Sequence, residues 1–144
     1  MTNVRHILQE KGGGLWSVSP EAIVFDALQL MAEKNCGALV VLEGEKLVGI
    51  FSERDYARKI ILKGRKSRET TVSEIMSTEV TFVHPGQSVD ECMALMTEKR
   101  IRHLPVVDQD KLLGVISIGD VVKAVISERE FTIKQLENYI TGGQ

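Results

Sequence analysis

The stretch Lys46-Leu47-Val48-Gly49-Ile50-Phe51-Ser52-Glu53-Arg54-Asp55 has a second copy in this chain of 144 residues. A shift of 65 positions lays it on Lys111-Leu112-Leu113-Gly114-Val115-Ile116-Ser117-Ile118-Gly119-Asp120. The same shift lays Val18-Ser19-Pro20 on Val83-His84-Pro85 without a gap. Shared hydrophobic periodicity alone does not make Pro, Gly, Ser and Asp recur in register. The sequence therefore predicts a duplicated unit, and two copies of one unit favour a pseudo-two-fold pair.

Length and composition limit the classes of protein to consider. With 43% hydrophobic residues the chain can form one core of ordinary size. Each half alone is marginal, because a domain of roughly 60 residues buries only about 60% of its unfolded surface, so we expect a shared core. The net charge of -2 gives no reason to expect nucleic-acid or membrane-surface binding. No apolar run approaches the roughly 20 residues of a membrane span, and no signal-peptide core precedes the repeats. We therefore expect a cytoplasmic protein.

Each repeat has the apolar pattern of strand, helix, strand, strand, helix. An α+β fold of two β-α-β-β-α units follows, with short helices at both ends of the chain. In the first repeat these elements fall at 16–18, 24–31, 38–42, 47–51 and 53–62. The predicted organisation is an N-terminal helix and Gly-rich joint at 1–15, the first repeat at 16–62, a linker at 63–79, the second repeat at 80–126 and a C-terminal helix at 127–144.

The repeated motif carries a family resemblance. Gly-x-x-Ser-x-x-Asp enters a helix twice, after a hairpin each time, and Ile101-Arg102-His103-Leu104-Pro105 opens the second hairpin. This pattern resembles a tandem pair of CBS domains, a Bateman module, from about Trp16 to Ile126, and is similar to small stand-alone bacterial CBS-pair proteins. The resemblance implies units packed sheet to sheet, a homodimer shaped as a disc of four repeats, and regulatory binding of adenosine-containing ligands in clefts between the repeats.

The motif also has the chemistry that a nucleotide needs. A helix start offers backbone N–H groups and a positive dipole end to a phosphate, and Ser52 and Ser117 add a hydroxyl there. Asp55 and Asp120 place a carboxylate one turn further on, where it can accept hydrogen bonds from a ribose diol. Arg54 adds a cation in the first repeat only, because the second has glycine at that position, so we expect two unequal clefts.

A plainer interpretation uses the same atoms. Serine followed three residues later by an acid is close to a capping box, which needs no ligand. Duplication of the motif, with glycine three residues before serine in both copies, favours the ligand-binding interpretation. The same atoms can still cap the helices in the empty state.

The family resemblance also implies a crossed set of ligand-binding residues. Asp120 and Ser117, with Val115, would act together with the first repeat's Trp16, Ser17, Val18, Gly37 and Ala38. Asp55, Ser52 and Arg54, with Ile50, would act together with the second repeat's Val83, Ile101, Arg102 and His103, next to Thr81 and Phe82.

Catalysis and metal binding are poorly supported. His103, Ser117 and Asp120 are the residue types of a hydrolytic triad, but a Ser-x-x-Asp helix start supplies neither a nucleophile elbow nor an oxyanion hole. Only three histidines occur, with no His or Cys pair at ligand spacing. We therefore expect no enzyme, no catalytic cofactor and no metal.

Two functions remain open. The first is a regulatory module that binds AMP, ADP, ATP or NAD and signals in trans, through its dimer or an unknown regulated protein, because the repeats occupy nearly the whole chain. The alternative is a structural scaffold that forms a CBS dimer and senses nothing.

Overall fold

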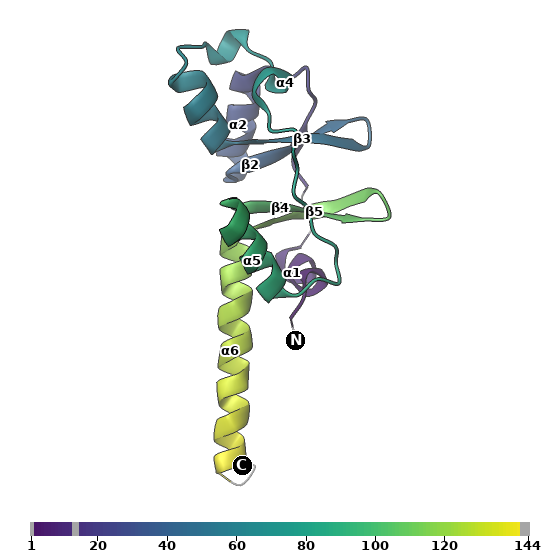
Figure 1. The fold of residues 1–144 in the computed structure, drawn as a ribbon, viewed down its shortest axis with the longest axis vertical. Coiled ribbons are helices and arrows are strands. Elements are labelled where there is room, and N and C mark those ends of the chain that lie inside the picture. Colours follow the sequence, from purple (N-terminus) through teal and green to yellow (C-terminus); the bar gives the residue numbers. More distant parts are fainter. Residues whose placement is uncertain (1, 13–14, 142–144) are drawn as a thin grey trace. The chain divides into compact units, whose positions relative to one another are not determined.

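The computed structural model describes residues 2–12 and 15–141 (Figure 1). The chain divides into two compact units. One comprises Gly14–Thr81 and Gln109–Leu113, and contains the first repeat. The other comprises Met1–Gly13, Phe82–Asp108 and Gly114–Gln144, so that the start of the chain belongs with the second repeat.

The first repeat forms a three-stranded sheet beside one long helix. Strand β1 (Ser17–Val18) pairs in parallel with β2 (Ala38–Glu43), which pairs antiparallel with β3 (Lys46–Ser52). Helix α2 (Val24–Lys34) joins β1 to β2. Strand β2 is a nearly continuous apolar run, as expected of a strand buried on both faces, and its first four residues are buried.

The helix predicted at 53–62 changes its character after one turn. It begins as α3 (Glu53–Tyr56) and continues as the π-helical turn η1 (Ala57–Ile61). A 3-10 turn, η2 (Ser67–Glu69), and the short helix α4 (Val72–Ile75) follow in the segment predicted as a linker. That segment does more than connect, because Val72 and Ile75 are fully buried in the core of this unit. The core residues are Val24, Ala27, Met31, Leu39, Val41, Phe51, Ile60, Val72 and Ile75.

The second repeat follows the same plan. Helix α5 (Val89–Lys99) precedes the hairpin of β4 (His103–Asp108) and β5 (Lys111–Ser117). In place of a first strand there is one parallel bridge, between Val83 and Val106. Its core also takes in Val4 and Ile7 of helix α1 (Val4–Lys11). The core residues are Val4, Ile7, Val83, Val89, Cys92, Met96, Leu104, Val106, Ile116, Val121 and Ala124.

Backbone geometry confirms the duplication. The parallel pairing of Val18 with Val41 recurs, 65 positions later, as that of Val83 with Val106. Both long helices of the repeats end on a left-handed residue, Asn35 at φ 51° and Arg100 at φ 54°. The hydrogen bond from the Cys36 N–H to the Met31 carbonyl has its counterpart from Ile101 to Met96, each 3.1 Å long. The predicted α+β class with two CBS-type repeats is confirmed.

A further equivalence lies outside the predicted repeats. The N–H groups of Val72 and Ser73 donate to the carbonyls of Ala22 and Pro20. In the other unit the N–H groups of Val4 and Arg5 donate to the corresponding carbonyls, those of Gln87 and Pro85. Helix α1 therefore occupies on the second repeat the place that α4 occupies on the first. Each repeat is covered by the segment that precedes the other repeat in the sequence.

The sequence predicts two helices at the end of the chain, the last helix of the second repeat and a separate C-terminal helix, but the structure has one continuous helix there. A boundary was predicted between residues 126 and 127, but one helix, α6 (Ile118–Ile140), runs across it for 23 residues. The reason is local, because Ser127-Glu128-Arg129-Glu130 contains neither Gly nor Pro to end a helix. The first part of α6 contacts α5 and α1 (Figure 1).

Candidate ligand-binding site

Both copies of Ser-x-x-Asp form capping boxes at helix starts. At α3 the Asp55 N–H donates to Ser52 Oγ at 3.2 Å, and the Ser52 N–H donates to Asp55 Oδ2 at 3.0 Å. At α6 the equivalent distances, between Asp120 and Ser117, are 3.2 and 2.8 Å. The motif thus fixes the position of each serine hydroxyl and each carboxylate before any ligand arrives.

Asp55 is almost completely enclosed by donors from the protein. Its residue exposure is 7%. Besides the Ser52 backbone, the hydroxyls of Ser52 and Ser77 each donate to it at 3.1 Å, and the Lys59 ammonium lies 3.3 Å from Oδ1. A ligand hydroxyl that binds here must displace one of these groups.

Asp120 is more open and holds a different cation. Its side chain is 25% exposed, and the Lys11 ammonium of α1 lies 2.9 Å from Oδ2. The same ammonium donates to the Val115 carbonyl at 2.7 Å. Burial by itself raises the pKa of Asp120, but hydrogen bonds from Lys11 and from the Ser117 backbone outweigh that effect and lower the pKa below its ordinary value of 3.8. The carboxylate is therefore charged at neutral pH, with an ammonium beside it at a helix N-terminus.

The residues that open each second strand lie beside the helix start of their own repeat. Ala38 pairs with Ser52 across the sheet, and the Glu53 N–H donates to the Gly37 carbonyl at 3.1 Å. In the second repeat the Ile118 N–H donates to the Arg102 carbonyl at 2.8 Å. The crossed assignment implied by the resemblance joins residues of different units, and stays a prediction.

The other predicted residues are spread over both units. Trp16 is exposed and the Lys34 ammonium lies 4.3 Å from its ring centroid. Ser17 and Val18 form β1, and the Ile50 N–H donates to the Ser77 carbonyl at 3.0 Å. Val83 is fully buried. Of the remaining predicted residues, two are exposed, Arg54 and Arg102, and two are half-buried, Ile101 and His103.

Sequence analysis missed Lys11, Ser77 and Lys59, the partners of the two carboxylates. Lys11 and Ser77 belong to the segments that precede the repeats. A signal for these segments exists, because Thr2-x-Val4-x-x-Ile7-Leu8 matches Thr70-x-Val72-x-x-Ile75-Met76. The shift between them is 68 positions, three more than the shift that aligns the repeats. A search without gaps therefore passes over it.

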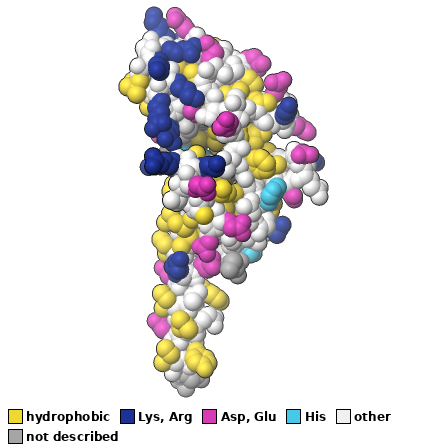
Figure 2. Space-filling model, in the orientation of Figure 1, with side chains coloured by type: hydrophobic (Ala, Val, Ile, Leu, Met, Phe, Trp, Pro, Cys, Tyr) yellow, Lys and Arg dark blue, Asp and Glu magenta, His cyan; other side chains and the backbone are white. Residues whose placement is uncertain are grey.

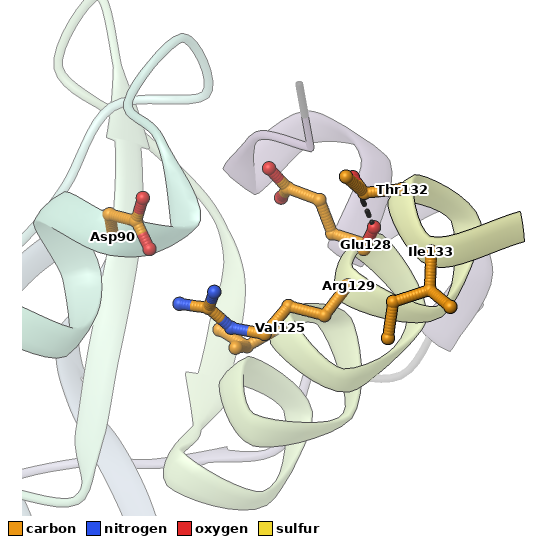
Figure 3. A pocket seen from close by; sticks show the side chains of 6 residues that line it. All are labelled: Asp90, Val125, Glu128, Arg129, Thr132 and Ile133. Carbon is orange, nitrogen blue, oxygen red and sulfur yellow. Dashed lines mark hydrogen bonds between the residues drawn. The ribbon is translucent and has the colours of Figure 1, made fainter. Parts of the chain in front are cut away.

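Two surface hollows lie along α6. One is lined by residues of α5 and α6, and the Arg129 side chain extends across it toward Asp90 (Figure 3). It is bordered by Asp90, Val125, Glu128, Arg129, Thr132 and Ile133. A second hollow follows one side of α6, next to the helix start at Ser117, and is lined by Ile118, Gly119, Val122, Lys123, Ile126 and Ser127. Within residues 2–12 and 15–141, no cluster of three His, Cys, Asp or Glu side chains is placed to hold a metal ion.

Comparison with known proteins decides the family. The family model for the CBS domain matches twice, at residues 14–62 and 72–127. The chain belongs to the CBS-domain family. CBS pairs are in general regulatory, ligand-binding modules, and adenosyl compounds are their general ligands. The second match begins at residue 72, so that it takes in the helix predicted as a linker.

Relatives of this CBS pair cover most of its length. A mitochondrial CBS domain-containing protein of Arabidopsis thaliana, CBSX3, is 41% identical over 99% of this chain and 73% of its own. The CBS domain-containing protein YhcV of Bacillus subtilis is 39% identical over 72% of this chain and 74% of its own. A solved CBS-domain protein of Burkholderia ambifaria, described as a signal-transduction protein, is 53% identical with a TM-score of 0.84, over 88% of this chain and 95% of its own.

The sequence predicts a cytoplasmic protein, and two findings bear on the compartment. In the part of the chain that the structure describes, no helix has the length and apolar character to cross a membrane. One relative is a mitochondrial protein.

Proposed function

We propose that this CBS pair is a regulatory protein that binds an adenine nucleotide of the AMP, ADP, ATP or NAD type. The observation that carries the proposal is the arrangement at the start of α6. A charged carboxylate, Asp120, and an ammonium, Lys11, lie side by side at 2.9 Å beside the capping hydroxyl of Ser117. General binding of adenosyl ligands by CBS pairs supports the same assignment.

Each group at this helix start matches one part of a nucleotide. The Asp120 carboxylate can accept hydrogen bonds from two ribose hydroxyls, and such bonds to a charged acceptor contribute about 1.5 to 3 kcal/mol each. The ammonium of Lys11 and the helix N-terminus favour a phosphate. In the proposed complex Lys11 moves from Asp120 to the phosphate and leaves the carboxylate to the ribose.

The two motif copies are proposed to bind with unequal affinity. A ligand at Asp55 must compete with Ser52, Ser77 and Lys59, all within 3.3 Å of a carboxylate that is almost fully buried. Asp120 is more exposed, and the cation that a ligand has to displace there, Lys11, is itself partly exposed. We therefore expect the cleft of Asp120 to fill first. The crossed partners assigned from the sequence remain part of this proposal.

Output is proposed to act in trans, in the cytoplasm. Ligand binding is expected to change the dimer or a contact with a separate regulated protein. No chemical step on the nucleotide is part of this function.

A structural scaffold is the second candidate. One observation favours it, because both Ser-x-x-Asp motifs form complete capping boxes from protein atoms alone. On that hypothesis the two aspartates stabilise helix ends, and the protein binds partners without responding to a ligand.

Thermal unfolding with and without nucleotide separates the two candidates. AMP, ADP, ATP and NAD are added one at a time to the full chain, with guanine nucleotides for comparison. A ligand at about 100 times its Kd adds roughly 2.7 kcal/mol to the free energy of unfolding. For a domain of this size the expected rise in Tm is about 5 to 10 °C. Asp120→Ala is expected to abolish that rise, and Asp55→Ala to reduce it less.

The matched control is Glu91→Ala. Glu91 faces the capping Ser88 at the start of α5, in the same unit, but is no part of the motif. This variant should keep the full nucleotide-dependent rise in Tm. The scaffold replaces the proposal if adenine nucleotides leave the Tm of the unaltered protein unchanged, while Asp55→Ala and Asp120→Ala each lower the free energy of unfolding by about 0.5 to 2 kcal/mol, the contribution of a helix cap.

A further inference from the structure

Basic residues are concentrated in one segment of the first-repeat unit. Residues 54–68, which we call the basic segment, contain seven Lys and Arg and a single acid, Asp55. The segment runs from α3 through η1 to η2. Figure 2 shows Lys and Arg side chains gathered on the side of this unit where Figure 1 places these elements. The net charge of the whole chain, -2, conceals this local excess of positive charge.

Three basic side chains of the segment have no partner among the described residues. Arg58, Lys63 and Lys66 are exposed, and make no hydrogen bond, ion pair or ring contact within residues 2–12 and 15–141. By contrast, Lys59 and Arg65 each pair with a carboxylate of their own unit. The three partnerless cations therefore do not serve the fold, and are free to meet an anion from outside.

Two adjacent aliphatic side chains are exposed in the middle of the same segment. Ile61 is 58% exposed and Leu62 76%, although the preceding Ile60 is buried in the core of the unit. They follow each other at the end of η1, between Arg58 and Lys63. The segment thus presents an uncovered aliphatic pair with cations before and after it.

The second repeat shows that the fold does not require this composition. The shift of 65 positions lays Lys63 on Glu128 and Arg65 on Glu130, both in α6. The helix end that is basic in the first repeat is therefore acidic in the second. An excess of positive charge that only one of two duplicated units carries favours a binding role for that surface.

We propose that the basic segment is a docking surface for an anionic lipid bilayer. Clusters of four to eight Lys and Arg are typical of proteins that bind anionic lipid headgroups. Aliphatic side chains among such cations become buried at the boundary between headgroups and acyl chains, while the long basic side chains extend to the lipid phosphates. The proposal concerns the place where the protein acts, and does not rest on nucleotide binding.

The aliphatic pair favours a bilayer over a nucleic acid. The same cations could contact a phosphate backbone, but binding of single strands depends on exposed aromatic side chains on which bases stack. The single aromatic residue of the segment, Tyr56, is half-buried. Ile61 and Leu62 would stay uncovered on a phosphate backbone, whereas a bilayer removes them from water.

Flotation of the full chain with lipid vesicles tests the surface. Vesicles of phosphatidylcholine are compared with vesicles that also contain about 40% phosphatidylglycerol, at about 0.15 M salt. Only the anionic vesicles should carry the protein. The double variant Lys63→Gln, Lys66→Gln should partition about 30-fold less, because each basic residue near an anionic surface contributes about 5-fold.

The matched control is the double variant Lys111→Gln, Lys134→Gln. It loses the same charge at two exposed positions outside the basic segment, and should float like the unaltered protein. The proposal is wrong if the unaltered protein floats with neither kind of vesicle, or if the control loses as much binding as Lys63→Gln, Lys66→Gln. It is also wrong if the basic segment binds a U-rich RNA oligonucleotide or polyglutamate but not the anionic vesicles.

A second measurement tests burial of the aliphatic pair. Trp16 is the one tryptophan of the chain, so Trp16→Phe gives a background in which Leu62→Trp reports on its own surroundings. Its fluorescence should shift to shorter wavelength with anionic vesicles. Leu113→Trp, at a position 48% exposed in the second hairpin, should show no shift. Leu62→Ser should partition about 10-fold less than the unaltered protein, since the lost carbons no longer enter the bilayer.

The fluorescence result can also overturn the proposal. If Leu62→Trp shows no shift, and Leu62→Ser floats as the unaltered protein does, the vesicles attract the cations alone. The aliphatic pair would then stay in water, and the segment would not be a bilayer-docking surface.

Discussion

At the scale of single residues, the two motif aspartates have different surroundings. Asp55 is buried among hydroxyl and backbone donors, whereas Asp120 is partly exposed and depends on one lysine. That lysine comes from a helix 109 positions away in the sequence. Because the hydrogen bond from Lys11 lowers the pKa of Asp120, it also links the stability of the second repeat to pH.

Lys11→Met should show this linkage. The folded-state pKa of Asp120 is depressed below 3.8, so its contribution to stability is present above that value and is lost as the pH falls through the folded pKa. The substitution should therefore cost about 0.5 to 1 kcal/mol at pH 7, since both side chains are partly exposed. The cost should be smaller once Asp120 is protonated, because only the hydrogen bond from Lys11 to the Val115 carbonyl is then lost. Urea unfolding from pH 7 down to about pH 3 measures the difference, with the exposed Lys111→Met as control. A cost that does not shrink with falling pH would contradict the assignment.

At the scale of elements, strands β3 and β5 differ in how closely a neighbouring segment packs on them. The segment that follows α4 lies against β3, and α1 lies against β5. Gly49 and Gly114 hold equivalent positions, three residues before the capping serines. A Cβ on Gly49 would lie 2.7 Å from Met76 Sδ and 3.0 Å from the Ser77 carbonyl oxygen. A Cβ on Gly114 would meet only Leu8 Cδ2, at 2.9 Å, the movable end of a side chain. The same motif glycine is thus more tightly constrained in the first repeat.

Gly49→Ala should accordingly destabilise more than Gly114→Ala. The first forces a backbone segment away from β3 and should cost about 1 to 3 kcal/mol, in the range of overpacked cores. The second is relieved by a rotation of Leu8 and should cost less than about 1 kcal/mol. Chemical unfolding of both variants gives the comparison. Equal losses of stability in the two variants would mean that both neighbouring segments move aside equally easily, and would contradict the prediction.

At the scale of the whole molecule, each repeat is completed by a segment that lies outside it in the sequence. Val4 and Ile7 of α1 are buried in the core of the second repeat, as Val72 and Ile75 of α4 are in that of the first. Helix α1 is therefore a core element of its unit.

Ile7→Ala tests the core role of α1. Because the side chain is 5% exposed, its truncation should cost about 2 to 5 kcal/mol, as at other buried aliphatic positions. Ile75→Ala, the equivalent change in α4, should cost a similar amount. Glu10→Ala, on the exposed side of α1, should leave the urea midpoint unchanged. If Ile7→Ala left the urea midpoint unchanged, as Glu10→Ala should, α1 would not be a core element of the second repeat.

The sequence by itself determined the duplication, the α+β class and most elements of the repeats. These follow from period, turn residues and caps, which act over a few neighbouring positions: the predicted hairpin at 38–42 and 47–51 is β2 and β3, and each predicted helix start at Ser52 and Ser117 carries its capping box. The tertiary structure alone decided that α1 covers the second repeat and that Lys11 reaches Asp120. Such contacts depend on the path of the chain between distant residues, and local periodicity carries no information about that path.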